Sequence, residues 1–293
     1  MSKTSKTAAT YPIVAALVTA EQMEGMGANR QWQASNDVQR QFLEQFFKPC
    51  RNEVGNIPEI ESLASWNFEE VNAFLRQRGF TIQLQPFRPP DFGVASVLDL
   101  LVEWVQKGEA RTVRGIDNRD YPAVRMSQEG AKFYEVPGHP HPIVALETKT
   151  GDVVYMTMLD SEPAGEFDLI DQVEALSHAM QPTYGYGGVI FPMVDLDQKV
   201  DITWLIGLTT TGVDGRPARI SQALQQNILK VNEVGARAKS AVAIAVTLSM
   251  RMPEPDLVIN GPFLVWFKRS HLAKPLFVGY ITQEHWKNPG SLK

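Results

Sequence analysis

The chain has 293 residues, 44% of them hydrophobic, which is enough to bury one large core or two modest ones. With 28 basic and 33 acidic residues its formal net charge is −5, which argues against nucleic acid or an anionic membrane as a partner. The one cysteine, Cys50, excludes an internal disulfide and is compatible with a reducing compartment. No apolar run approaches the roughly 18 residues needed to span a bilayer.

Near the N-terminus, Lys3 and Lys6 precede a short apolar run over residues 11–18 that contains Pro12. This pattern fits a polar tail leading into a buried first helix better than a secretory signal. We therefore expect a cytoplasmic protein, with secretion as the alternative.

The following residues predict a mainly helical N-terminal part. Apolar side chains recur at helical spacing over residues 38–47, and Asn67 is placed to cap a second helix over residues 68–78. Residues 80–86 alternate as a strand, and the apolar run 94–105 is interpreted as a buried helix. Strands dominate from about residue 121.

One helix, near residues 166–180, interrupts these later strands. We find no internal repeat and no linker long enough to separate independent domains. The expectation is a single α+β domain over residues 1–293, with a mostly helical part at 1–120 and a part rich in β-strand at 121–293.

The segment from residue 233 to 251 is the most informative about function. From 236 to 248, small or apolar residues occupy alternate positions, and Val242, Ile244 and Val246 favour a strand over a helix. A Met-Arg-Met-Pro sequence follows, which suits an exposed loop. On pattern alone, an ordinary half-buried strand followed by a turn is the simpler interpretation.

The flanking residues resemble the C-terminal third of the serpins. That family has a strand ending in an Asn-Glu-x-Gly hinge, an alanine-rich reactive loop, and then Pro-Phe and Leu-Phe-x-Gly strands. Here the order is Asn-Glu-Val-Gly at 232–235, Pro-Phe at 262–263 and Leu-Phe-Val-Gly at 276–279. Weaker similarity extends back to about residue 121. The family's Asn-Ala-x-x-Phe-x-Gly-x-Trp strand, which borders the gap that the loop enters, is not found among residues 1–120.

The resemblance implies a metastable fold with large β-sheets and an exposed reactive loop at 233–255. A protease cuts this loop, which then inserts into the central sheet. The implied loop hinge comprises Glu233, Gly235, Ala236, Ala238 and Ser240. The scissile-bond candidates are Ser249, Met250 and Arg251, with the Ser249–Met250 bond preferred.

Other candidates for chemistry are weak. His139 and His141 lack a matching third ligand nearby in the sequence, so we expect no metal site. No catalytic motif or cofactor motif is recognised, and we expect neither an enzyme nor a cofactor. The first hypothesis is therefore an inhibitor of a serine or cysteine protease. The alternative is a non-inhibitory serpin-like binding protein, suggested by the short N-terminal part and the unrecognised strand.

Overall fold

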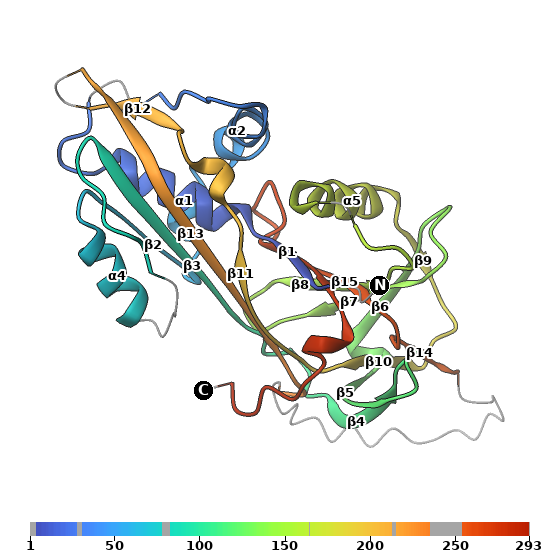
Figure 1. Cartoon of the computed structure of the whole chain (residues 1–293). Coiled ribbons are helices and arrows are strands. Elements are labelled where there is room, and N and C mark those ends of the chain that lie inside the picture. Colours follow the sequence, from blue (N-terminus) through green and yellow to red (C-terminus); the bar gives the residue numbers. More distant parts are fainter. Residues whose placement is uncertain are drawn as a thin grey trace.

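A computed structural model of the chain describes residues 4–27, 31–77, 83–163, 165–212, 215–234 and 254–292. Within these residues the strands form three sheets, of seven, five and four strands (Figure 1). The predicted α+β class is confirmed, and so is the dominance of strands after residue 121.

The five-stranded sheet contains the strand that leads to the predicted loop hinge. Its strand order is β11 (Val194–Val200), β13 (Pro217–Val231), β3 (Asp91–Leu101) and β2 (Ile60–Ser65), and β12 (Thr209–Thr211) also pairs with β13. β3 and β13 run parallel, whereas β11 and β2 are antiparallel to their neighbours. The two long strands therefore form the centre of this sheet.

The buried helix predicted over residues 94–105 is wrong, because β3 occupies most of this segment. Both faces of β3 are covered: Val94 and Leu98 pack in the cluster that contains helix α1 (Thr10–Glu21), while Ala95 and Val97 pack beneath α4 (Phe68–Gln77). A strand buried on both faces loses its alternation and becomes an unbroken apolar run, which periodicity cannot distinguish from a buried helix. The strand predicted at 80–86 is also absent from the described part, residues 83–86.

The other helices follow the sequence closely. α2 (Asp37–Phe42), a π-helical turn at Leu43–Phe47 and α3 (Lys48–Cys50) cover the first predicted helix. Asn67 caps α4, because its Oδ1 accepts the Glu69 amide hydrogen at 2.9 Å. α1 is buried along most of its length, as expected of a first core helix, and α5 (Glu166–Ala179) matches the last predicted helix.

The remaining two sheets carry the rest of the strands. The seven-stranded sheet has the order β1 (Lys6–Ala8), β16 (Phe277–Ile281), β15 (Phe263–Lys268), β8 (Val153–Met158), β7 (Ile143–Glu147), β6 (Ala131–Glu135) and β9 (Gln181–Thr183). The four-stranded sheet has the order β14 (Asp256–Val258), β10 (Gly188–Pro192), β5 (Asp120–Ser127) and β4 (Glu109–Arg114).

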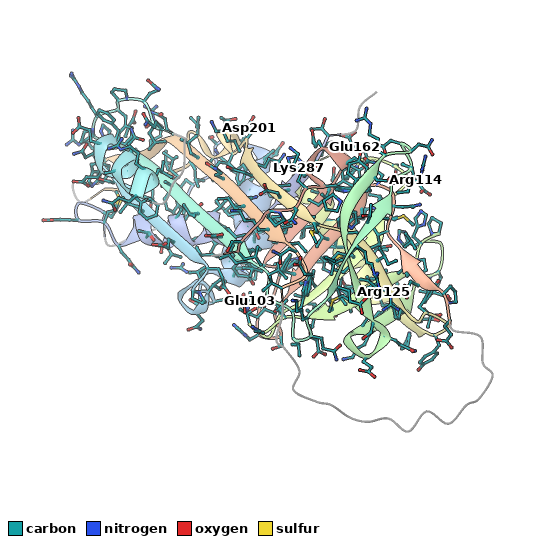
Figure 2. The ribbon with its side chains drawn as sticks, turned by 90° about the horizontal axis from the view of Figure 1, so that it is seen from below. Glu103, Arg114, Arg125, Glu162, Asp201 and Lys287 are labelled. Atoms are coloured by element: carbon teal, nitrogen blue, oxygen red, sulfur yellow. The ribbon has the colours of Figure 1, made fainter. Side chains whose placement is uncertain are left out.

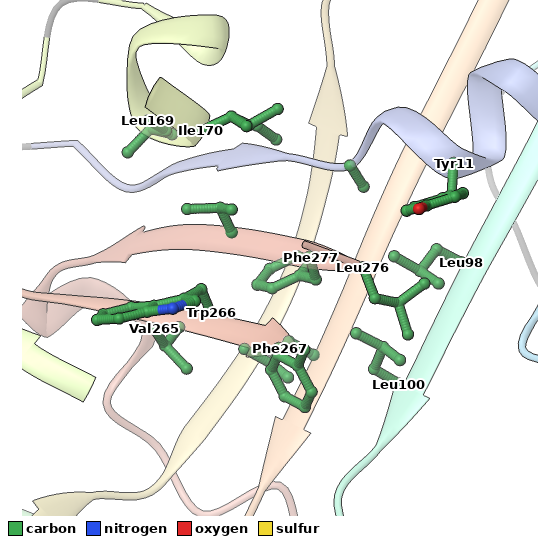
Figure 3. Packing of buried hydrophobic residues seen from close by; sticks show 14 of the residues in the cluster. Tyr11, Leu98, Leu100, Leu169, Ile170, Val265, Trp266, Phe267, Leu276 and Phe277 are labelled. Carbon is green, nitrogen blue, oxygen red and sulfur yellow. The ribbon is translucent and has the colours of Figure 1, made fainter. Parts of the chain in front are cut away.

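One hydrophobic cluster joins all three sheets. In Figure 3, Leu98 and Leu100 of β3 lie close to Leu276 and to Tyr11 of α1, with Phe267 of β15 nearby. All five side chains are buried, so the central sheet and the seven-stranded sheet share one core. Burying each such side chain contributes about 1.5–3 kcal/mol.

A buried ion network also links the seven-stranded sheet to the start of β2. Arg269, in the turn after β15, donates to both carboxylate oxygens of Asp152 at 2.6 and 2.9 Å. It also donates to both oxygens of Glu59 at 3.1 and 2.7 Å. The hydrogen bonds that Asp152 accepts from Arg269 raise the pKa of Arg269, so the guanidinium stays charged.

Candidate functional site: the loop hinge and the parallel strand pair

The predicted hinge begins at Glu233, shortly after β13 ends, and the backbone of Glu233 and Val234 is held by the segment that follows β3. The Trp104 amide N–H donates to the Val234 carbonyl at 3.1 Å, and the Gly108 amide N–H donates to the Glu233 carbonyl at 3.0 Å. At Gly108 a side chain would not fit, because a Cβ would lie 2.4 Å from Cγ1 of Val124. Glu233, a predicted hinge residue, is therefore fixed beside the start of β4.

The side chain of Trp104 connects the end of β13 to the segment that follows β3. It is fully buried, its Nε1–H donates to the Asn232 carbonyl at 2.8 Å, and its ring meets Phe191 edge-on at 5.7 Å. The Asn232 Oδ1 accepts the Val234 amide hydrogen at 2.9 Å. These bonds pair the carbonyls of residues 232–234 and the Val234 amide within the protein.

The chain beyond the predicted loop is fixed at the other side of the four-stranded sheet. Arg125 of β5 binds both carboxylate oxygens of Asp256 in β14, at 2.7 and 3.0 Å, and Figure 2 shows Arg125 on this sheet. The Gly187 amide donates to the Pro255 carbonyl at 3.0 Å. The two ends of the predicted loop thus lie at opposite edges of the sheet, β4 and β14.

Most predicted site residues lie outside the described residues. These are Gly235, Ala236, Ala238 and Ser240 of the hinge, and the scissile-bond candidates Ser249, Met250 and Arg251. Glu233 is described and half-buried. The functional assignments of all eight residues stay predictions.

The parallel pair β3/β13 is the second part of the site. Eleven residues of each strand are in register, from Arg219 beside Asp91 to Lys230 beside Leu101, with one irregularity between Ile220 and Gln222. Both strands run toward the hinge, so the chain leaving β13 can turn back beside either of its neighbours.

Buried amides hold the middle of β13 to the N-terminal segment. Gln225 Nε2 donates to the Ala9 carbonyl at 2.9 Å, and it also donates to Asn227 Oδ1 at 2.9 Å. Asn227 Nδ2 donates to Thr7 Oγ1 at 3.0 Å. Gln225, Asn227 and Thr7 are all buried, so each bond replaces water that is excluded here.

β3 is the neighbour of β13 that lies within residues 1–120, so it is the candidate for the unrecognised motif strand. Placing Trp104 on the last residue of the Asn-Ala-x-x-Phe-x-Gly-x-Trp motif puts Ser96 at its Asn, Leu100 at its Phe and Val102 at its Gly. Of the motif residues named here, this chain keeps only the tryptophan, so a search for the motif sequence could not find it. The only feature left to indicate this strand was a tryptophan that follows an apolar run.

The two histidines considered as metal ligands, His139 and His141, each have a side-chain partner. His139 Nε2 lies 2.8 Å from Thr157 Oγ1, and His141 Nε2 lies 2.7 Å from Asp160 Oδ1. The described residues contain no group of three or more histidine, cysteine or acidic side chains able to hold a metal ion. Burial raises the pKa of Cys50 to about 11, which keeps its thiol protonated.

Comparison with known proteins gives a fold for the chain and a family-model match for part of it. A family model described as serpin (serine protease inhibitor) matches residues 196–283, which include β13 and the predicted hinge residues. Native protease nexin-1, solved with heparin, has a TM-score of 0.59 at 11% identity and aligns over 96% of this chain and 93% of its own. Mouse protein-Z dependent protease inhibitor has a TM-score of 0.58 at 13% identity, and the alignment covers 95% of this chain and 90% of that protein. Human thyroxine-binding globulin, in complex with thyroxine, has a TM-score of 0.57 at 12% identity, and the alignment covers 94% of this chain and 91% of that protein.

The chain therefore has the serpin fold, and its residues 196–283 match the serpin family model. The alignments extend over almost the whole chain, so residues 1–120 contribute to that fold despite their unrecognised sequence. In the described part of the chain, no helix is long and apolar enough to cross a membrane.

Proposed function

We propose that the chain inhibits a serine or cysteine protease by exposing the reactive loop, residues 233–255, as a substrate. The protease cuts near Ser249–Met250, and the released loop inserts between β3 and β13. The observation that carries this proposal is the parallel β3/β13 pair beside the hinge residue Glu233. The predicted alternation of small and apolar residues at 236–248 supports it.

The direction of the strands selects the place of insertion. A segment that leaves the end of β13 and turns back runs antiparallel to β13. Between β3 and β13 it would be antiparallel to both neighbours, whereas between β11 and β13 it would be parallel to β11. Antiparallel pairing is slightly more stable per residue, so the β3/β13 gap is favoured.

The energy available from insertion is large. One parallel ladder of eleven pairs is exchanged for two antiparallel ladders, a net gain on the order of ten hydrogen bonds. At about 0.5–1.5 kcal/mol each, they contribute on the order of 5–15 kcal/mol, comparable to the stability of a whole domain. Insertion would then be effectively irreversible.

The role of the chain is that of a substrate that traps its protease, so no catalytic residue or cofactor of its own is required. Arg251 suits trypsin-like specificity pockets, and Ser249 or Met250 suits proteases with small or apolar pockets. The shared core of the three sheets supports a single domain. The single buried cysteine is compatible with action in the cytoplasm.

The test mixes the intact protein with trypsin and, separately, with pancreatic elastase, and looks for a complex that survives SDS. Ala236→Arg should abolish that complex while cleavage continues, because a charge would be buried between the strands. Lys239→Glu is the matched control, since residue 239 has the opposite parity and would face solvent. If Ala236→Arg trapped protease as well as the parent does, the insertion mechanism would be wrong.

The second candidate is a non-inhibitory binding protein. Human thyroxine-binding globulin has the same fold and was solved in complex with thyroxine. The divergence of the β3 motif, which keeps only its tryptophan, favours this candidate. A cleaved loop that adds no stability to the protein would support it.

A further inference from the structure

The C-terminal segment continues past β16 and reaches the hinge. A 3₁₀ turn at Gln283–His285 follows β16, and the Ser5 amide donates to Glu284 Oε1 at 2.9 Å. Trp286 comes next, is only 2% exposed and meets the ring of Tyr121 edge-on at 5.0 Å. This segment, residues 283–292, is called the tail below. Figure 1 shows it running beside the end of β13.

A preformed turn in the tail points a carbonyl group at the hinge. The turn is Asn288-Pro289-Gly290, in which Asn288 Oδ1 accepts the Gly290 amide hydrogen at 2.8 Å. Pro289 restricts its own φ, and Gly290 adopts φ +72°, a left-handed conformation that suits glycine. The Gly290 carbonyl accepts a hydrogen bond from Asn232 Nδ2 at 2.9 Å. Beyond the turn, Leu292 is buried.

Asn232 therefore bonds to three partners at once. Its Nδ2 donates to the tail at Gly290, its Oδ1 accepts from Val234, and its carbonyl accepts from Trp104. It is 2% exposed, so a partner lost at this position is not replaced freely by water. The residue directly before Glu233 is thus fixed by the tail as well as by β13.

We infer that the tail is a latch that restrains the hinge and sets the rate of loop insertion. Insertion requires the backbone at Glu233 and Val234 to leave Gly108 and Trp104 and to turn back along β13. While Asn232 is bonded to Gly290, this movement is opposed at its starting point. The inference rests on the proposed function, because it concerns the regulation of the same hinge.

Two variants release the latch by different means. A chain ending at Asn288 removes the Gly290 carbonyl and Leu292 but keeps Trp286. Gly290→Val keeps the length but disfavours the left-handed backbone, because β-branched residues rarely adopt positive φ. A Cβ at this position meets no atom within 4 Å, so the backbone alone is perturbed. Gly290→Asn is the matched control, since asparagine tolerates this conformation.

The readout is the rate at which intact protein takes up a synthetic peptide of residues 236–249, followed by the shift in melting temperature. Loss of one hydrogen bond should accelerate uptake about two- to tenfold in both release variants and leave Gly290→Asn like the parent. Amide exchange at Trp104, Gly108 and Val234 should speed up in parallel. Equal uptake and equal exchange in all forms would overturn the latch.

The same samples separate the two proposals. Each form is also nicked at Ser249–Met250 and melted. If nicking stabilises every form while uptake rates stay equal, the latch is wrong and the inhibitory function stands. If nicking stabilises none of them and no peptide is taken up, the inhibitory function itself has failed.

Discussion

A disulfide between β3 and β13 should prevent loop insertion without touching the loop. Asp99 and Ile228 are register partners near the hinge end of the two strands, and neither is fully buried. Neighbouring strands lie about 4.8 Å apart, which falls within the Cα separations that disulfides bridge. The native Cys50 is buried with a raised pKa, so it should not compete in Asp99→Cys/Ile228→Cys.

The expected effect is the loss of the whole gain in stability on cleavage. In the parent, nicking at Ser249–Met250 should release a net gain on the order of ten hydrogen bonds, or about 5–15 kcal/mol. For a domain of this size that corresponds to a rise in melting temperature on the order of tens of degrees. The oxidised variant should show no such rise. Intact and nicked forms of one variant are compared, so the stability contributed by the disulfide itself largely cancels.

The assay is calorimetry of intact and nicked protein, oxidised and then reduced. Reduction should restore both the gain in melting temperature and the SDS-stable complex. The matched control is Asp195→Cys/Lys230→Cys, which joins β11 to β13 at a partner pair on the other side of β13 and should leave the gain intact. If nicking raised the melting temperature of oxidised Asp99→Cys/Ile228→Cys as much as that of the parent, the loop would not enter the β3/β13 gap. If only the oxidised β11/β13 control lost the rise in melting temperature, the loop would enter between β11 and β13 instead.

Three further predictions concern the scaffold. In urea titrations, Arg269→Met should lower the free energy of unfolding by about 3–5 kcal/mol, because it leaves the buried carboxylate of Asp152 without its ion-pair partner. A loss below about 1 kcal/mol would contradict this prediction. Trp104→Phe should cost about 1–3 kcal/mol by the same titration, because it leaves the Asn232 carbonyl without its donor; unchanged amide exchange at the hinge would refute the role given to Trp104. Burial, and next the charge of His141, lower the pKa of His139, so the unfolded chain binds the proton more readily. Stability should therefore be complete above about pH 6.5 and fall as the pH drops toward the folded pKa, and His139→Asn should reduce the difference between urea midpoints at pH 7.5 and 5.5.

The fold was predictable where one face of an element meets water. The helix over residues 68–78 was predicted together with its cap at Asn67, and the structure confirms both the helix and the cap. The prediction for β3 was wrong because α1 and α4 cover its two faces. This covering removes the alternation of apolar and polar residues that identifies a strand. Covering on both faces is a tertiary property, so local pattern could not supply it.

For the candidate site, the sequence allowed a prediction only around the hinge. Glu233 was predicted from Asn-Glu-x-Gly; its carbonyl accepts the Gly108 amide hydrogen, and its role as a hinge residue stays a prediction. Trp104 was missed because its interactions join segments more than a hundred residues apart, and the motif around it has diverged. The tail turn at Gly290 carried a sequence signal, Asn-Pro-Gly, but its partner Asn232 is distant in the chain.

The central claim is that the loop inserts into the sheet after cleavage. The most direct test is the melting temperature of the protein before and after one nick at Ser249–Met250, made with an elastase-type protease. The account predicts a rise of tens of degrees, from the net gain of about ten hydrogen bonds. An unchanged or lower melting temperature would contradict it and favour the binding-protein alternative.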